Sequence, residues 1–291
     1  MNEVVGEAVH ILQTILPRMF IGILAGNLII SSPIFRRFVE FSVKLFRIRS
    51  GVAVAAFFAD KAVGTSVLAE MYKKRIIDEK EVVIASVLGL LPLSIRSAFL
   101  TLAPVSISTL GFKLGASFLI IELLSKFIVA GVAYSFIGKI TVSEEIIDYR
   151  NERSGFHSLL FALKTFFRVS LIISLTVFIT TFLINSGSFT SVDEKSMLIL
   201  AGAGSTLAGF GVAGSLLSEG KLKEEAVLIL LFVALALHRV VEAIRYSMPM
   251  NVSFFGYKTG VKVAALTLLA NELSCVVGLV FAYASVSLGI I

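Results

Sequence analysis

Cysteine and charge are both scarce in this sequence. Cys275 is the single cysteine among 291 residues, which rules out an intrachain disulfide and any zinc or iron–sulfur site built from clustered cysteines. Charged residues make up 16% of the chain, whereas soluble domains carry about 25%. The mean hydropathy is +0.94. We therefore expect the chain to lie in a membrane, with the lipid bilayer as a partner.

The sequence also lacks the features of a cleavable signal peptide and of a nucleic-acid-binding protein. The N-terminal residues MNEVVGEAVH contain no lysine or arginine, so we expect no cleavable signal peptide and expect the first hydrophobic helix to direct insertion. The net charge is +6, but the basic residues cluster at the ends of hydrophobic runs, which is how membrane proteins are oriented. Binding to nucleic acid is therefore not expected.

The spans carry no signature of an intramembrane hydrolase. A serine protease needs a serine hydrogen-bonded to a histidine, together with oxyanion donors. Ser205 is followed by threonine, and His238 comes one helix later with no second signature. The spans also lack the paired aspartates of an aspartyl protease. The chain is predicted not to be an enzyme, and we expect no metal and no cofactor.

Hydrophobic runs recur along the chain, and a spanning helix needs about 20 apolar residues. Candidate spans lie at 11–34, 82–103, 115–138, 163–185, from 226 onward, and at 262–287. Two further segments, 51–72 and 198–217, are rich in glycine, alanine and serine. The only extended polar stretch, 139–158, separates two halves. The predicted domains are a first repeat at 1–140, a linker at 141–160 and a second repeat at 161–291.

One twelve-residue pattern occurs in both halves. PVSISTLGFKLG at 104–115 returns as PMNVSFFGYKTG at 249–260, which is 145 residues later and without a gap. The match is looser elsewhere, because 66–70 aligns with 215–219 at an offset of 149, so we expect loops that differ by a few residues. Matched proline and glycine interruptions in the two halves of a membrane protein indicate a binding site.

Lysine and arginine counts help to decide how the halves are oriented, because basic residues stay on the cytoplasmic side. Suppose that 51–72 and 198–217 each enter and leave on one side. Seventeen Lys/Arg then lie inside and five outside, with 36–49, 73–80, 139–164 and 239–262 as the inside stretches. If 51–72 crossed fully, its two flanking basic clusters would face opposite sides. The alternative is an ordinary span with a self-neutralising Asp60–Lys61 pair.

The predicted fold is therefore an all-α polytopic membrane protein of two inverted-topology repeats. Each repeat would have three spanning helices and a re-entrant helical hairpin. The chain would lie in the cell membrane with its N- and C-termini outside.

The small-residue segments, the charged link RIIDEKEVVIAS at 75–86 and the Pro-then-Gly motif resemble the GATE, or nucleoside recognition, membrane domain. This domain occurs in archaeal membrane proteins of unassigned function, in spore maturation proteins, and in the permease parts of B-type ferrous-iron and concentrative nucleoside transporters. The resemblance covers nearly the whole chain as two tandem copies, and it implies hairpins and broken helices around a central site. The chain has no cysteine-containing iron motif and no GTPase domain, and it is shorter than a full nucleoside carrier.

Ionisable residues within spans cost about 2.5–3.5 kcal/mol on insertion scales, so they usually face protein or water. Asp60 and Lys61 lie near the middle of 51–72, where the tip of a re-entrant hairpin would meet a bound solute. Lys113 and Lys258 are equivalent in the motif and could bind a carboxylate or phosphate. The alternative for these two lysines is snorkelling at an interface.

The other candidates lie in the predicted helices. Glu272 follows Asn271 and has no basic neighbour in its helix, which favours binding of a cation or proton. Glu122 and Lys126, one turn apart, are interpreted as a neutralised pair. The predicted substrate-binding residues are Asp60, Lys61, Lys113, Asn251, Lys258, Asn271 and Glu272. The predicted gating or ion-pair residues are Arg96, Arg239, Glu242 and Arg245, the last three at a spacing that puts them on one helix face.

The function predicted from these observations is a secondary transporter or permease with a small-molecule or ion substrate. The solute would be small and polar, anionic or nucleoside-like, and would move by alternating access of the two repeats. A homo-oligomer is compatible with this prediction. The alternative is a non-transporting membrane scaffold or assembly factor, which would have no continuous cavity between its halves.

The inverted arrangement predicts that the links after the two hairpins face opposite sides of the membrane. In whole cells, a cysteine introduced as Asp78→Cys should react with a membrane-impermeant maleimide only after permeabilisation. A cysteine introduced as Leu222→Cys should react without permeabilisation. Labelling of both positions from the same side would contradict the inverted model.

Overall fold

The computed structural model describes residues 50–136 and 193–291, together with scattered positions between 9 and 37 and between 160 and 182. The predicted linker at 141–160 and most of the predicted spans at 11–34 and 163–185 lie outside the described residues. All regular secondary structure in the described residues is helical. Within this part of the chain, the prediction of an all-α fold is confirmed.

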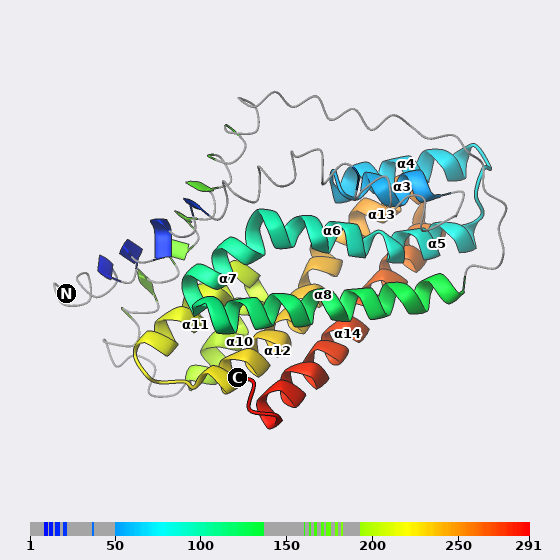
Figure 1. Cartoon of the computed structure of the whole chain (residues 1–291). Helices are drawn as coiled ribbons and strands as arrows, with labels where there is room; N and C mark the ends of the chain where they lie inside the picture. The colour runs from blue at the N-terminus through cyan, green and yellow to red at the C-terminus, as the bar shows by residue number, and fades with distance from the viewer. Residues whose placement is uncertain are drawn as a thin grey trace.

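In the part of the chain that the structure describes, four helices are long and apolar enough to cross a membrane (Figure 1). They are Glu79–Leu110, Phe112–Ser135, Glu224–Phe255 and Tyr257–Ser287. The first consists of α5 (Glu79–Leu88), α6 (Leu90–Ser97), a π-helical segment η1 (Ala98–Leu102) and α7 (Ala103–Leu110). The second is α8 (Phe112–Ser135), the third is α12 (Glu224–Glu242), η2 (Ala243–Ser247) and α13 (Met248–Phe255), and the fourth is α14 (Tyr257–Ser287). These helices support the prediction of a membrane protein.

Each small-residue segment forms a hairpin of two short helices. The first hairpin consists of α3 (Gly51–Ala56) and α4 (Lys61–Lys73), and the second of α10 (Glu194–Gly204) and α11 (Thr206–Ser218). The breaks are local: Asp60 caps α4 by accepting a hydrogen bond from the Ala62 amide at 2.7 Å, and Ser205 is extended between α10 and α11. Hairpin α3–α4 packs against α13, and hairpin α10–α11 packs against α7.

From the second helix of each hairpin to the start of the last helix, the element bounds repeat at an offset of 145 residues. Helices α4 and α11 are both 13 residues long and begin at 61 and 206, and the π-helical segments begin at 98 and 243. The alignment at an offset of 149 does not fit these bounds. The expectation of loops that differ by a few residues holds at the hairpin tips, where residues 57–60 separate α3 from α4 and Ser205 alone separates α10 from α11. The similar small residues of 66–70 and 215–219 matched out of register.

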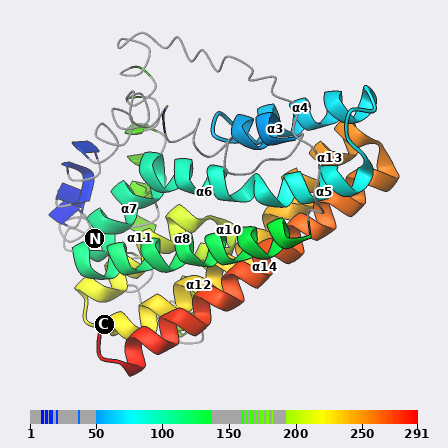
Figure 2. The ribbon, with the colours of Figure 1, turned by 45° about the vertical axis from the view of Figure 1, so that its right-hand side comes forward.

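The two interrupted long helices, Glu79–Leu110 and Glu224–Phe255, run in opposite directions. Glu79, at the start of the first long helix, accepts a hydrogen bond from Lys262 at 2.6 Å and one from Thr259 at 3.4 Å. Both partners lie in the first turns of α14, directly after the end of α13. The start of Glu79–Leu110 therefore lies beside the end of Glu224–Phe255, as Figure 2 shows.

The twelve-residue motif is a sharp turn between two helices. Gly111 has φ 81° and ψ 166°, and Gly256 has φ 79° and ψ 167°, a region open essentially only to glycine. A Cβ added at Gly115 would lie 2.7 Å from the carbonyl carbon of Ser106, and one added at Gly260 would lie 2.5 Å from Cα of Val252. Glycine at these positions lets each helix pack directly on the helix before the turn.

Replacing these close-contact glycines is predicted to destabilise the protein. Gly115→Ala and Gly260→Ala should each lower the free energy of unfolding by about 1–3 kcal/mol, because the added methyl group overlaps backbone atoms. Gly131→Ala is the matched control, since a Cβ there meets nothing within 4 Å in the same helix α8. Thermal unfolding in detergent measures the difference. Equal stability of Gly115→Ala and Gly131→Ala would contradict the close-packing role.

Candidate functional site

Charged side chains meet where the long helices are halfway along their length. This central polar cluster consists of Lys61, Glu122, Lys126, Arg239, Glu242 and Asn271. Lys61 begins α4 at the tip of the first hairpin, and the others come from α8, α12 and α14. The side chain of Glu122 is 2% exposed, and Lys126 is 4% exposed. Such burial of charge inside spanning helices is costly, which makes the cluster the leading functional candidate.

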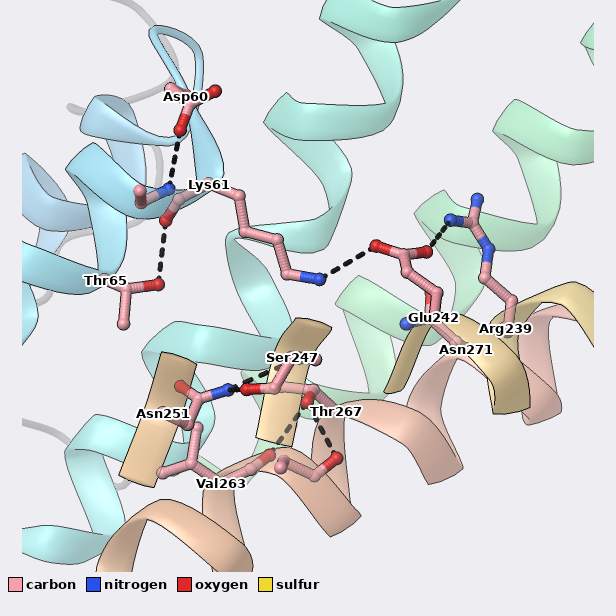
Figure 3. A network of polar contacts seen from close by, with 12 residues as sticks. Asp60, Lys61, Thr65, Arg239, Glu242, Ser247, Asn251, Val263, Thr267 and Asn271 are labelled. Atoms are coloured by element: carbon pink, nitrogen blue, oxygen red, sulfur yellow. Dashed lines mark hydrogen bonds and ion pairs between the residues drawn. The ribbon is translucent and has the colours of Figure 1, made fainter. Parts of the chain in front are cut away.

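Glu242 is shared by two cations (Figure 3). Lys61 Nζ donates to its Oε1 at 3.0 Å, and Arg239 Nη1 donates to its Oε2 at 2.9 Å. Charge-assisted hydrogen bonds of this kind are stronger than neutral ones. The arrangement ties the tip of hairpin α3–α4 to α12, across 181 residues of sequence.

A second contact joins equivalent positions of the two halves. Lys126 Nζ on α8 donates to Asn271 Oδ1 on α14 at 2.5 Å, and the two residues are 145 apart, which is the repeat offset. The contact ties the middle of α8 to the middle of α14.

A small cavity lies between the first hairpin and helices α12 to α14. Its volume of about 20 Å³ has room for about one water molecule. Its polar lining comes from Lys61, Thr65, Ser86, Arg239, Glu242, Ser247, Asn251, Thr267 and Asn271. The threonine hydroxyls donate to carbonyls of their own helices, Thr65 to Lys61 and Thr267 to Val263, so their oxygen lone pairs are left for the cavity.

The π-helical segment η2 shapes one wall of this cavity. Ala243 and Ser247, its first and last residues, both line the space. A π-turn disturbs the regular hydrogen bonding of a helix and is frequent at functional sites. Asn251 donates through Nδ2 to the Ser247 carbonyl at 2.8 Å, so this buried amide supports the irregular turn.

The structure brings together several of the residues predicted from the sequence. Lys61, Arg239, Glu242, Asn251 and Asn271 all line the cavity. Arg96 and Asp60 lie next to it at the hairpin tip, where Arg96 Nη1 is 4.0 Å from Asp60 Oδ2.

Other predicted residues lie away from the cavity. Lys113 and Lys258 are exposed, one at the start of α8 and one at the start of α14, at opposite ends of the bundle. Arg245 is also exposed, with its guanidinium carbon 5.2 Å from the centre of the Tyr246 ring. Glu272 is half-buried on α14 and does not line the cavity.

Glu122 and Lys126 belong to the cluster through partners on other helices. Lys126 donates to Asn271, and Glu122 Oε1 lies 4.0 Å from Arg239 Nη2. The interpretation of these two residues as a self-contained pair is therefore incomplete. Lys126 and Asn271 are equivalent at the offset of 145, but equivalence alone did not indicate that they touch. No pattern in the sequence linked Glu122 to Arg239.

Similar proteins occur in Methanocaldococcus jannaschii. One uncharacterised protein is 26% identical over 289 residues, which covers 89% of this chain and 90% of the relative. A second is 28% identical over 263 residues, covering 82% of this chain and 81% of the relative, and a third is 25% identical over 241 residues, covering 74% and 77%. No family model and no solved structure matches the chain.

The shared carboxylate predicts a large difference between two Glu→Gln substitutions. Glu242→Gln leaves Lys61 and Arg239 without their anion, and should lower the free energy of unfolding by about 3 kcal/mol. Glu70→Gln removes an exposed ion pair with Lys74, whose side chains are 63% and 66% exposed, and should change it by under about 1 kcal/mol. Unfolding midpoints in detergent give the comparison. Similar losses in both variants would show that the cluster does not stabilise the fold.

Proposed function

We propose that this protein is a membrane transporter, a secondary transporter or permease, that moves a small polar anion. The observation that carries the proposal is the central polar cluster at half the length of the long helices. Charged residues at that depth usually line a substrate or ion pathway. A cavity beside the cluster favours transport over a non-transporting scaffold.

The charge of the cavity supports an anionic solute. Lys61 and Arg239 contribute two positive charges to its lining, and Glu242 contributes one negative charge. Lys61 has three donors and Arg239 has five, whereas Glu242 accepts one hydrogen bond from each. Arg239 Nε has no hydrogen-bond partner in the described part of the chain. A carboxylate or phosphate oxygen entering the cavity would find these donors available.

Two arrangements in the fold support alternating access of two inverted repeats. The two interrupted long helices run in opposite directions, and Lys126 and Asn271, which are 145 residues apart, are in contact at mid-length of α8 and α14. This is the relation expected for repeats whose axis lies in the membrane plane. The GATE-like resemblance of the sequence fits the same arrangement, in a cell membrane.

Both hairpins fit a re-entrant role. Lys61 at the tip of the first hairpin reaches Glu242, and the Ala203 carbonyl at the tip of the second lies 3.2 Å from His238 Nδ1. Both partners are near the middle of the 32-residue helix Glu224–Phe255. Hairpin tips at this depth would present backbone groups to a solute at the bilayer centre.

Flux measurements with a charge-removing variant test the proposal. The purified protein in proteoliposomes should carry at least one member of a panel of chloride, phosphate, acetate and succinate. Lys61→Met should lower that flux by about 10-fold or more, because one charge-assisted hydrogen bond is worth about 1.5–3 kcal/mol. Lys113→Met, which removes an exposed lysine at the end of the bundle, should keep the flux of the unmodified protein.

Two outcomes would overturn the anion-transporter proposal. One is the absence of flux for every anion in the panel. The other is a Lys61→Met variant that transports as fast as Lys113→Met, because the cavity lysine would then have no role in the pathway.

A further inference from the structure

Glu122 is a buried carboxylate outside the cavity. It lies at the middle of α8, is 2% exposed and does not line the cavity. Neither of its carboxylate oxygens has a hydrogen-bond partner in the described part of the chain. Buried polar groups in proteins are nearly always hydrogen-bonded, so a carboxylate of this kind calls for an explanation.

The nearby cations donate their hydrogen bonds elsewhere. Arg239 Nη2 is the nearest cationic nitrogen at 4.0 Å, but Nη1 of the same guanidinium donates to Glu242. Lys126, one turn after Glu122, donates to Asn271. Glu122 thus has positive charge near it, without the contacts that would hold its ionised form.

The elements packed against α8 contribute a mixed set of charged and titratable groups. Helix α12 carries Arg239 and Glu242, α14 carries Glu272 and Cys275, α6 carries Arg96, which lies near Asp60, and α5 carries Glu79, Lys80 and Glu81 near its start. Of these groups, Arg239 is the one whose charged atoms lie within 4.0 Å of Glu122. Protonation of Glu122 is therefore linked most directly to Arg239.

Glu81 provides a contrast at similar burial. Glu81 is 6% exposed, and its Oε1 accepts a hydrogen bond from the Ser50 amide at 3.1 Å. Protonation of Glu81 would weaken that contact. Protonation of Glu122 costs no hydrogen bond, because neither of its oxygens accepts one in the described part of the chain.

We infer that Glu122 is a proton-binding site, and that its proton decides which carboxylate Arg239 pairs with. With Glu122 protonated, Arg239 stays on Glu242 and faces the cavity, as in this structure. When the proton leaves to solvent, the ionised carboxylate attracts the guanidinium, whose Nη2 lies 4.0 Å from Glu122 Oε1, and competes with Glu242 and with a cavity anion for it. The proton binds to and leaves from a carboxylate oxygen, and no other bond changes.

This inference deepens the proposed function and, as to transport, rests on it. An anion in the cavity is held by Arg239 only while Glu122 carries its proton. Anion and proton then bind and cross together, so the proton is the coupling ion of an anion–proton symporter. Without transport, the same site would still bind a proton.

Infrared spectroscopy of the full chain in lipid tests the proton site without a substrate. The unmodified protein should show the C=O stretching band of a protonated carboxyl group, which decreases as the pH is raised. Glu122→Gln should lose this band. Glu81→Gln, the matched buried control, should retain it, and so should Glu272→Gln.

Three results would overturn the assignment: no titrating carboxyl band in the unmodified protein, a band that persists in Glu122→Gln, or a band lost only in Glu272→Gln. If Glu122→Gln does not fold, Glu122→Asp serves in its place, and its band must shift in frequency or in midpoint pH. An unchanged band in Glu122→Asp would equally overturn the site.

A transport measurement distinguishes failure of this inference from failure of the proposed function. Proteoliposomes loaded with a pH-sensitive dye should take up protons when the transported anion of the panel is added outside. Glu122→Gln should keep anion exchange and lose proton uptake. Anion flux without proton uptake in the unmodified protein would overturn proton coupling alone. The absence of anion flux, with an unchanged infrared band, would overturn the transporter proposal but not the proton site at Glu122.

Discussion

The carboxylate of Glu242 is the point on which the central arrangement depends. It accepts hydrogen bonds from Lys61 and Arg239 at mid-length of the helix Glu224–Phe255. Neither cation could stay at mid-length of the bundle without a counter-ion, because an unpaired charge there is costly. The Glu242 side chain therefore fixes the tip of hairpin α3–α4 against α12. Because it neutralises only one of the two cations, Lys61 and Arg239 keep one surplus positive charge between them.

The two hairpins are built on one plan but packed differently. Around the second hairpin, the rings of Phe118, Phe210 and Phe232 meet with centroid distances of 5.2 Å and 5.0 Å, which fills the space with apolar contact. The positions equivalent to Phe118 and Phe210 in the other half are Val263 and Thr65, and both line the cavity. The cavity exists because one half has small side chains where the other has aromatic rings.

The sequence supported the larger features of this fold and not the contacts of the site. Helix lengths and charge asymmetry are local or summed properties, so the long helices and a break near Asp60 could be predicted from the sequence, whereas the break at Ser205 was not placed. The Lys61–Glu242 hydrogen bond joins residues 181 apart, and no local rule pairs them. Glu122 and Lys126 obeyed the one-turn rule for ion pairs, yet neighbouring helices supplied Arg239 and Asn271 as partners. The motif lysines were predicted as ligands, but glycine geometry governs the motif and leaves both lysines exposed.

The packing of three residues at the first hairpin differs from that of the equivalent residues at the second. The Phe57 ring lies over Gly64 and Gly89, where an added Cβ would come within 2.4 Å and 2.5 Å of it. At the equivalent positions, Gly202 lies against Gly209 and Ala234, with an added Cβ on Gly202 2.6 Å from Cβ of Ala234. A phenylalanine at 202 would need glycine at 234, and an alanine at 89 would displace the ring at 57. The residues at these sites can change only together, so a helix of one half can no longer replace its equivalent in the other. A chain assembled from two copies of either half would therefore lose the contrast between small and aromatic side chains that creates the cavity.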